Sequence, residues 1–221
     1  CHTVTGLSQT VHTSNSGAAS AQHKLYPGEN IKFGPIENPE SNGFHESFYL
    51  PTYQISEQCL PCHDLMVRGA ETEITFTEWN RIPGFSMFGG IPCQSCHMPE
   101  KEDGTHEHNF IGVDLDLAIP YLENPLFEKV SDMLESSVEM SFEVWGQYLP
   151  ESISALDTLY IPIAIESLTA HSIPSGTSFN REAWIELTVS NNDDILYSSG
   201  LILQASDALD YNDEDLLLFK S

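Results

Sequence analysis

The sequence predicts an α+β chain in two parts: an irregular part over residues 1–118, and a helix followed by an antiparallel, sandwich-like β-domain over residues 119–221. Three observations lead to this prediction. Residues 1–118 show little periodicity and are rich in Gly, Pro and His. Residues 122–138 repeat apolar side chains at helical spacing. Beyond residue 138 the apolar positions alternate with a period of two, which is typical of strands.

Each part has its own expected elements. In the first part, short helices are expected to carry the cysteine pairs described below, for instance over residues 56–67. In the second part, four strands are expected after the helix, at residues 140–144, 159–165, 185–189 and 195–203. Asn191 to Asp194 is typical of a hairpin turn before the last strand. The acidic tail at 207–215 is expected to be a solvated loop, with a calcium site as the alternative.

The chain is strongly acidic, with 33 Asp and Glu against 8 Lys and Arg, which gives a net charge of −25. That charge excludes nucleic acid and anionic membrane surfaces as partners, because both bind basic faces. No stretch approaches the roughly 18–20 consecutive apolar residues of a transmembrane helix, so no transmembrane segment is expected. With 40% hydrophobic residues, the chain is expected to fold and not to remain a disordered acidic tail.

Four of the five cysteines form two Cys-x-x-Cys pairs, and a histidine follows each pair directly. The residues are Cys59, Cys62 and His63, and then Cys93, Cys96 and His97. Cys-x-x-Cys-His is the attachment signature of c-type haem. Two thiols bond the vinyl groups of the porphyrin, and the histidine supplies the proximal imidazole of the iron. Spacing alone also allows a four-thiolate zinc site, a disulfide framework or a redox pair, but these leave the two histidines unexplained.

The first two residues, Cys1 and His2, match the end of a third motif of this kind, whose first cysteine would lie upstream. This match predicts a third haem c, attached through Cys1 and ligated by His2, and a chain that is part of a longer protein. The alternative is an acylated cysteine at the N-terminus of a lipoprotein. The expected cofactors are therefore haem c and its iron, two from complete motifs and one from this partial motif.

Six further histidines are present, and five of them lie within residues 1–110. This surplus is expected if a second histidine binds each iron from the opposite face. Bis-histidine ligation is typical of low-potential electron carriers, whereas a methionine ligand raises the potential. His12, His45 and His108 are the expected distal ligands, because each lies close in sequence to a haem motif.

The remaining histidines allow alternatives. His23 lies beside a small polar segment and is expected to be an exposed loop residue. Only one of His106 and His108 is expected to bind a given iron, because residues two apart on a strand share a face. His171 lies in a loop of the second part and is expected to fold back and cap a haem as a further distal ligand. The alternative is a loop histidine that bonds the backbone.

Several segments of the chain resemble multihaem c-type cytochromes. In the first part these are residues 32–35, 43–47, 59–63, 77–79, 93–99 and 106–112. They resemble the group related to the tetrahaem electron carrier of nitrifying bacteria, in which Cys-x-x-Cys-His-Met-Pro recurs. Residues 170–176, 181–184 and 196–200 are similar to a C-terminal β-domain of larger members. The resemblance implies a first domain packed around haems, residues 1–118, followed by a linker helix and β-domain, residues 119–221.

The leading hypothesis is electron transfer through closely spaced haems with mainly bis-histidine ligation, so the chain is expected to be an electron carrier and not an enzyme. Three haems attached within the first part must lie near one another. The alternative is part of a multihaem oxidoreductase, of the nitrite or hydroxylamine type, with one iron open to substrate. The surplus of histidines argues against an open iron.

Partners and location follow from charge and chemistry. The acidic surface predicts redox partner proteins with a basic docking face, or stacking of copies of the chain into a longer haem chain such as an extracellular filament. Covalent haem attachment takes place outside the bacterial cytoplasm. The expected location is therefore periplasmic, at the cell surface or extracellular.

Overall fold

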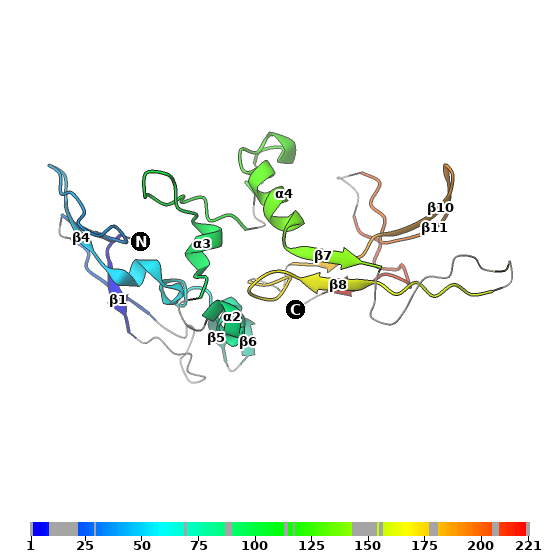
Figure 1. Cartoon of the computed structure of the whole chain (residues 1–221), viewed down its shortest axis with the longest axis horizontal. Helices are drawn as coiled ribbons and strands as arrows, with labels where there is room; N and C mark the ends of the chain where they lie inside the picture. The colour runs from blue at the N-terminus through cyan, green and yellow to red at the C-terminus, as the bar shows by residue number, and fades with distance from the viewer. Residues whose placement is uncertain are drawn as a thin grey trace.

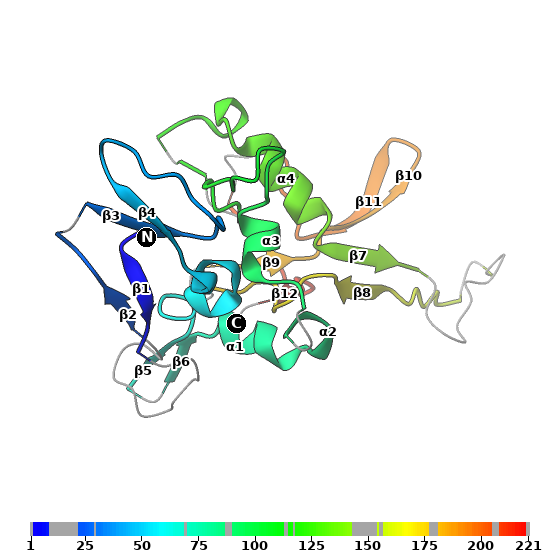
Figure 2. The same ribbon diagram turned by 60° about the vertical axis from the view of Figure 1, so that its left-hand side comes forward.

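The computed structural model describes residues 2–8, 22–28, 30–68, 70–86, 90–112, 115–116, 118–142, 154, 157–176, 181–204 and 208–219. Its strands pair into six two-stranded sheets, and its helices are few and short, so the α+β class is confirmed at a coarse level. In two views 60° apart, α3 (Cys93–His97) lies between β4 (Glu46–Tyr49) and β7 (Val138–Ser141) (Figures 1 and 2).

The first part contains three of the two-stranded sheets. In order, β1 (Val4–Leu7) pairs with β2 (His23–Leu25), β3 (Ile31–Gly34) with β4 (Glu46–Tyr49), and β5 (Leu65–Val67) with β6 (Ala70–Glu73). The β3–β4 pair is parallel and the other two are antiparallel. The helices are η1 (Pro51–Gln54), η2 (Ser56–Gln58), α1 (Thr75–Arg81), α2 (Pro83–Ser86) and α3. Two-stranded pairs are marginally stable alone, so they depend on packing against other groups.

The prediction of a short helix is confirmed for the second cysteine motif, which forms α3. It is wrong for residues 56–67. There the helix ends after η2, a turn carries the motif, and the chain continues into β5. Arg68 adopts a positive φ of 54°, and this turns the chain so that β5 pairs with β6. Residues 65–67 therefore pair with β6 as a strand and do not continue the helix that was expected over 56–67.

The second part contains the remaining elements. They are η3 (Tyr121–Glu123), α4 (Phe127–Glu135), β7 (Val138–Ser141), β8 (Ala164–Ser167), β9 (Ala183–Trp184), β10 (Leu187–Asn191), β11 (Asp194–Ser199) and β12 (Leu218–Phe219). The predicted hairpin is confirmed, because β10 pairs with β11 across a turn in which Asn192 has a φ of 54°. A helix inside 122–138 is also confirmed, although it is shorter than predicted.

The strands of the second part form three separate antiparallel pairs: β7 with β8, β9 with β12, and β10 with β11. The strand expected at 159–165 is observed only from residue 164 onward. A sandwich of two larger sheets is not found among the described residues, so that part of the prediction stays a prediction. None of the helices in the described ranges has the length and apolar character to cross a bilayer.

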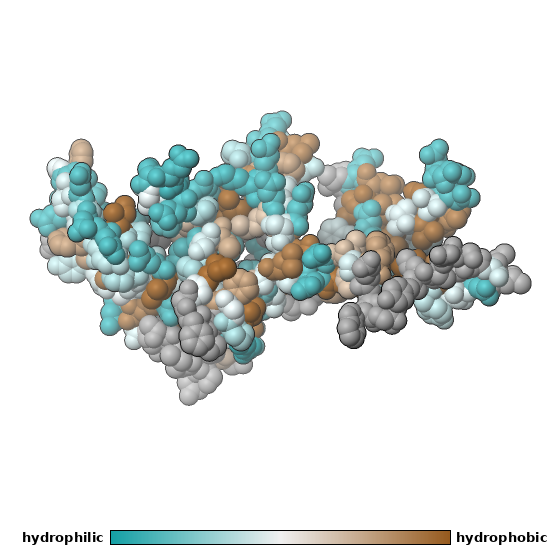
Figure 3. Space-filling model, in the orientation of Figure 1, coloured by the Kyte–Doolittle hydropathy of each residue, from teal (hydrophilic) through white to brown (hydrophobic). Residues whose placement is uncertain are grey.

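Few hydrophobic side chains are buried. Those in the described residues are Val4, Leu60, Met66, Phe76, Trp79, Ile111 and Val130. The chain exposes 15973 Å² of surface, whereas a folded monomer of 24.6 kDa exposes about 10,000 Å². Hydrophobic residues such as Leu187, Ile195 and Leu196 lie on the surface, and the space-filling view shows this over β10 and β11 (Figure 3). Protein side chains alone thus leave much apolar surface uncovered.

One hydrophobic cluster joins the two parts. Leu60 from the first motif packs with Phe76 and Trp79 of α1, and Ala170 from the second part packs against them. The Phe76 and Trp79 rings have centroids 5.4 Å apart. Trp79 Nε1 donates a hydrogen bond to the carbonyl of Ile91 at 3.0 Å, just before α3. This cluster therefore fixes both cysteine motifs and the loop at 168–176 relative to α1.

We expect Phe76→Ala to lower the free energy of unfolding by about 3–5 kcal/mol, because it leaves a cavity in this cluster. Phe44→Ala is the matched control, since Phe44 is 87% exposed and Phe76 only 5%. The measurement is denaturant unfolding of the purified protein followed by tryptophan fluorescence. Equal effects of the two variants would contradict the assignment of this cluster as the core.

Candidate functional site

The two complete cysteine motifs lie side by side. Cys59 and Cys93, the first cysteine of each motif, are half-buried and in contact, whereas Cys62 and Cys96 are exposed. The Cys59 thiol donates a hydrogen bond to Cys93, which raises the pKa of Cys59 and lowers the pKa of Cys93. Ser56 Oγ strengthens the contact, because it accepts a hydrogen bond from the Cys93 backbone N–H at 3.0 Å. Groups attached to the two motifs would therefore be neighbours.

The four thiols do not converge on one point. Across the described ranges, no three of the His, Cys, Asp and Glu side chains are grouped closely enough to hold a metal ion. A four-thiolate zinc site would require such a group. A haem iron requires only two protein ligands, because the porphyrin supplies the other four. The relevant geometry for haem is therefore a pair of facing imidazoles.

His97 and His171 form one such pair. Their ring centroids are 6.3 Å apart and their planes differ by 16°. His97 Nδ1 donates to the carbonyl of Ile111, which fixes the ring and leaves Nε2 available as a ligand. The pKa of His97 is lowered, chiefly by burial and further by nearby His171 and His63, although the bond to Ile111 raises it. The ring is therefore held in the neutral form that binds metals.

A network on α1 holds the loop that carries His171. Glu78 Oε2 accepts hydrogen bonds from the backbone N–H of Ser172 at 3.2 Å and from the Ser175 hydroxyl at 2.7 Å. Because the Ser175 proton points to Glu78, the Thr75 hydroxyl donates to Ser175 Oγ, at 2.6 Å. These bonds span nearly a hundred residues of sequence. Together with the packing of Ala170, they bring His171 to the ring of His97.

His2 and His108 form a second pair, with ring centroids 5.9 Å apart and planes inclined by 41°. His2 Nδ1 donates to the carbonyl of Phe33 at 2.6 Å, and its ring stacks on Tyr53 with centroids 5.7 Å apart. A Cβ at Gly34 would lie 3.8 Å from His2 Nδ1, so the strand passes close beneath this ring. β3 thus fixes the orientation of His2.

Both pairs fit a metal ion held between two imidazoles. A metal–nitrogen distance of about 2 Å, with about 1 Å more from nitrogen to ring centre, places the two ring centres about 6 Å apart. At all four rings Nδ1 faces a backbone carbonyl: those of Phe33, Ile111, His106 and Ser172. Nε2 is the remaining ligand atom in each ring. The ring spacing and the Nδ1 partners are therefore those that bis-histidine ligation of a haem iron requires, although His2 and Tyr53 show a similar spacing of ring centroids, 5.7 Å, as an ordinary stacked pair.

The other predicted ligands are placed differently. His63 Nδ1 lies 3.7 Å from Glu73 Oε2. The ring of His45 lies beside Asn42 and Ser47, at 3.4 and 3.3 Å, within its own loop. Cys1 and His12 lie outside the described residues.

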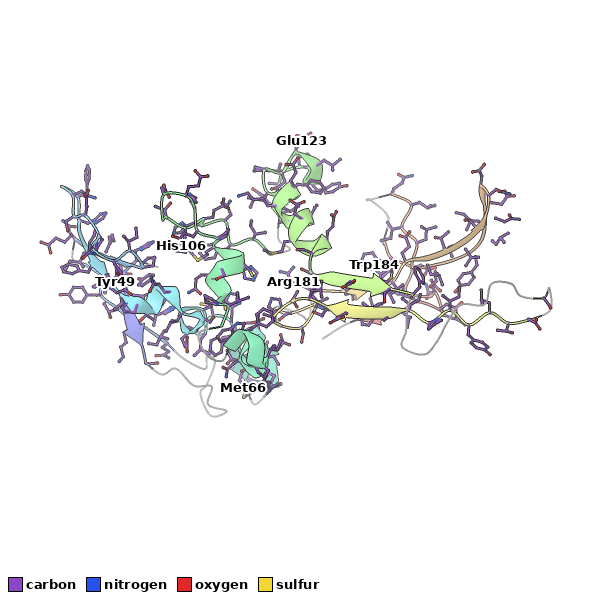
Figure 4. All side chains as sticks on the ribbon, viewed as in Figure 1. Tyr49, Met66, His106, Glu123, Arg181 and Trp184 are labelled. Atoms are coloured by element: carbon purple, nitrogen blue, oxygen red, sulfur yellow. The ribbon has the colours of Figure 1, made fainter. Side chains whose placement is uncertain are left out.

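Two features escaped the sequence analysis. His23 is half-buried and its Nε2 lies 3.0 Å from the carbonyl of Gln58, directly before the first motif, whereas an exposed loop histidine was expected. His106 Nδ1 donates to the carbonyl of Met98 at 2.7 Å, so this ring lies against the end of α3 (Figure 4). Glu73 and Glu78 were not singled out either, since nothing in their local sequence distinguishes them from surface acids.

No family model matches the chain, and no match was found among curated proteins or solved structures. The function proposed below therefore rests on the residues of this chain and their geometry.

We expect Glu78→Ala to release the loop at 168–176, because Ser172 and Ser175 lose a charged acceptor. Hydrogen bonds to charged groups contribute about 1.5–3 kcal/mol, and partial exposure places this loss at the low end. Hydrogen–deuterium exchange at residues 169–173 measures the effect, with faster exchange expected. Glu71→Ala, at an exposed acid on β6, is the control and should leave the loop unchanged. Unaltered exchange in Glu78→Ala would contradict the role of Glu78.

Proposed function

We propose that this protein transfers electrons through covalently attached haem c groups whose irons are bound mainly by two histidines. The observation that carries the proposal is the pairing of His97 with His171. His97 follows two cysteines on one short helix, and a loop from the other part of the chain brings a second imidazole to 6.3 Å from it. Neither a zinc site nor a disulfide framework requires that second imidazole.

Each haem has its own proposed residues. Cys93 and Cys96 attach one, which His97 and His171 ligate. Cys59 and Cys62 attach another, with His63 as proximal ligand and His12 or His45 as the proposed distal ligand. Cys1 attaches a third, between His2 and His108. The haem iron supplies one-electron chemistry. The chain's own residues hold the rings and orient the imidazoles, several of them through backbone carbonyls.

The small protein core supports the same proposal. The exposed surface exceeds that of a typical folded monomer of this mass by more than half, and many exposed residues are apolar. Flat apolar porphyrins packed within residues 1–118 would cover exposed apolar side chains of the first part, such as Leu25, Phe44 and Phe48. The exposed apolar residues of β10 and β11 lie in the second part, for which no haem is proposed.

Bis-histidine ligation favours an electron carrier over an enzyme, since it leaves no coordination position for a substrate. The proposed partners are redox proteins with a basic docking face, because the chain carries a net charge of −25. Stacking of copies into a longer haem chain is a further proposed arrangement. The proposed location is outside the bacterial cytoplasm, in the periplasm, at the cell surface or beyond it.

The direct test is the pyridine haemochrome spectrum combined with intact mass, on protein produced in a bacterial host that attaches haem c. We expect three covalent haems per chain, two at the complete motifs and one at Cys1. Removing the thiols of a single motif, as in Cys93→Ser with Cys96→Ser, should remove one haem. A colourless protein that binds zinc would overturn the proposal.

We expect His171→Ala to convert one haem from the low-spin to the high-spin ferric form, because its iron loses a strong-field ligand. Electronic absorption and electron paramagnetic resonance spectra measure this change. His106→Ala is the matched control, since His106 also contacts the backbone near α3 but faces no other imidazole in the proposed scheme. An unchanged spectrum for His171→Ala would remove His171 from the ligand set.

A further inference from the structure

The three proposed proximal histidines differ in what their Nδ1 atoms face. His2 and His97 donate to backbone carbonyls, those of Phe33 and Ile111. His63 instead faces a carboxylate, with Nδ1 lying 3.7 Å from Glu73 Oε2. A backbone carbonyl is neutral and a carboxylate carries a full negative charge. The imidazole of His63 therefore has a different electrostatic environment from the other two.

Glu73 is buried and directed at this ring. It is 5% exposed and lies at the end of β6, where Oε1 accepts a hydrogen bond from the Thr75 backbone N–H at 3.1 Å. Its other oxygen, Oε2, has no hydrogen-bond partner among the described residues. A buried carboxylate is costly unless it is paired. His63 Nδ1 lies 3.7 Å from Oε2, beyond hydrogen-bond length, so a slightly closer approach of the ring would make its N–H a donor to that oxygen.

We propose that Glu73 is a positioning residue that lowers the reduction potential of the haem held by Cys59, Cys62 and His63. The inference rests on the proposed function. A carboxylate that accepts the Nδ1–H makes the imidazole a stronger electron donor to the iron. Its negative charge also stabilises the ferric state relative to the ferrous state, which carries one positive charge fewer. Reduction here adds one electron to the iron, and no bond is made or broken.

The position of Glu73 gives the lowered potential a directional effect. Cys59 and Cys93 are in contact, so the haems of the two complete motifs would be neighbours. His97 has a neutral carbonyl where His63 has a carboxylate. Glu73 therefore biases an electron to leave the haem of His63 for the haem of His97.

The test is Glu73→Gln, which keeps the shape of the side chain and removes its charge. Redox titration of the haem-loaded protein, followed by absorption at constant pH, gives one component per haem. The component absent from a Cys59→Ser and Cys62→Ser double variant belongs to the haem of His63. We expect Glu73→Gln to shift that component's ferrous-to-ferric ratio about tenfold at a fixed potential, which is a rise of about 59 mV.

Controls separate this effect from a general change of charge or fold. Glu71→Gln removes the same charge from an exposed position on the same strand. It should shift the reduction potential of each haem by only a fraction of the change expected for Glu73→Gln. If Glu73→Gln fails to accumulate with haem, Glu73→Asp withdraws the carboxylate by one methylene and should raise the same component by less.

Two results would overturn the inference. One is that the reduction potential of the haem at His63 does not change in these variants. The other is that Glu73→Gln raises the potentials of all haems equally, by the same amount as Glu71→Gln. A wild-type chain without covalent haem would overturn the proposed function itself, and this inference with it.

Discussion

The candidate site depends on the contact between Ala170 and the cluster of Leu60, Phe76 and Trp79. This contact joins the two parts of the chain. The hydrogen bonds that Glu78 accepts from Ser172 and Ser175 add a second restraint on the same loop. A shift of one residue in that loop would move the imidazole of His171 away from His97. The geometry of the best-defined histidine pair is therefore a property of the interface, and no single element determines it.

A second constraint is the imbalance between backbone pairing and side-chain burial. Among the described residues every sheet has two strands, and such pairs gain stability only when one face is covered. Phe33 and Phe48 lie on neighbouring strands with ring centroids 6.1 Å apart, and Phe48 remains exposed. A chain built in this way requires apolar material other than its own side chains. Haem is the proposed material because the cysteine motifs occur in the same part of the chain.

Most local features of the chain were predictable from sequence, and most long-range contacts were not. The exceptions are the helix expected over 56–67, which does not form, and the approach of the His171 loop to the first part. The Cys-x-x-Cys-His spacing is a short-range signal, and α3 forms where it predicts a helix. The turn at Asn192 was equally clear from composition. By contrast, His108 follows the motif of Cys93 and His97 closely in sequence, whereas its ring lies against that of His2. Periodicity carries no information about contacts between residues a hundred positions apart. The same reason hides Glu73, whose burial depends on how β6 packs.

The groups that face the Nδ1 atoms of the three proposed proximal histidines differ. This difference can give otherwise similar sites different reduction potentials. The carbonyls that face His2 and His97 belong to the backbone, so they remain whatever side chain is present at Phe33 or Ile111. The acceptor at His63 is a side chain and can be exchanged by a single substitution. Under the proposed function, a side chain therefore adjusts the reduction potential at His63 but not at the neighbouring His97. Because driving force depends on the difference between two potentials, a change at one site alone is enough to set the direction of transfer.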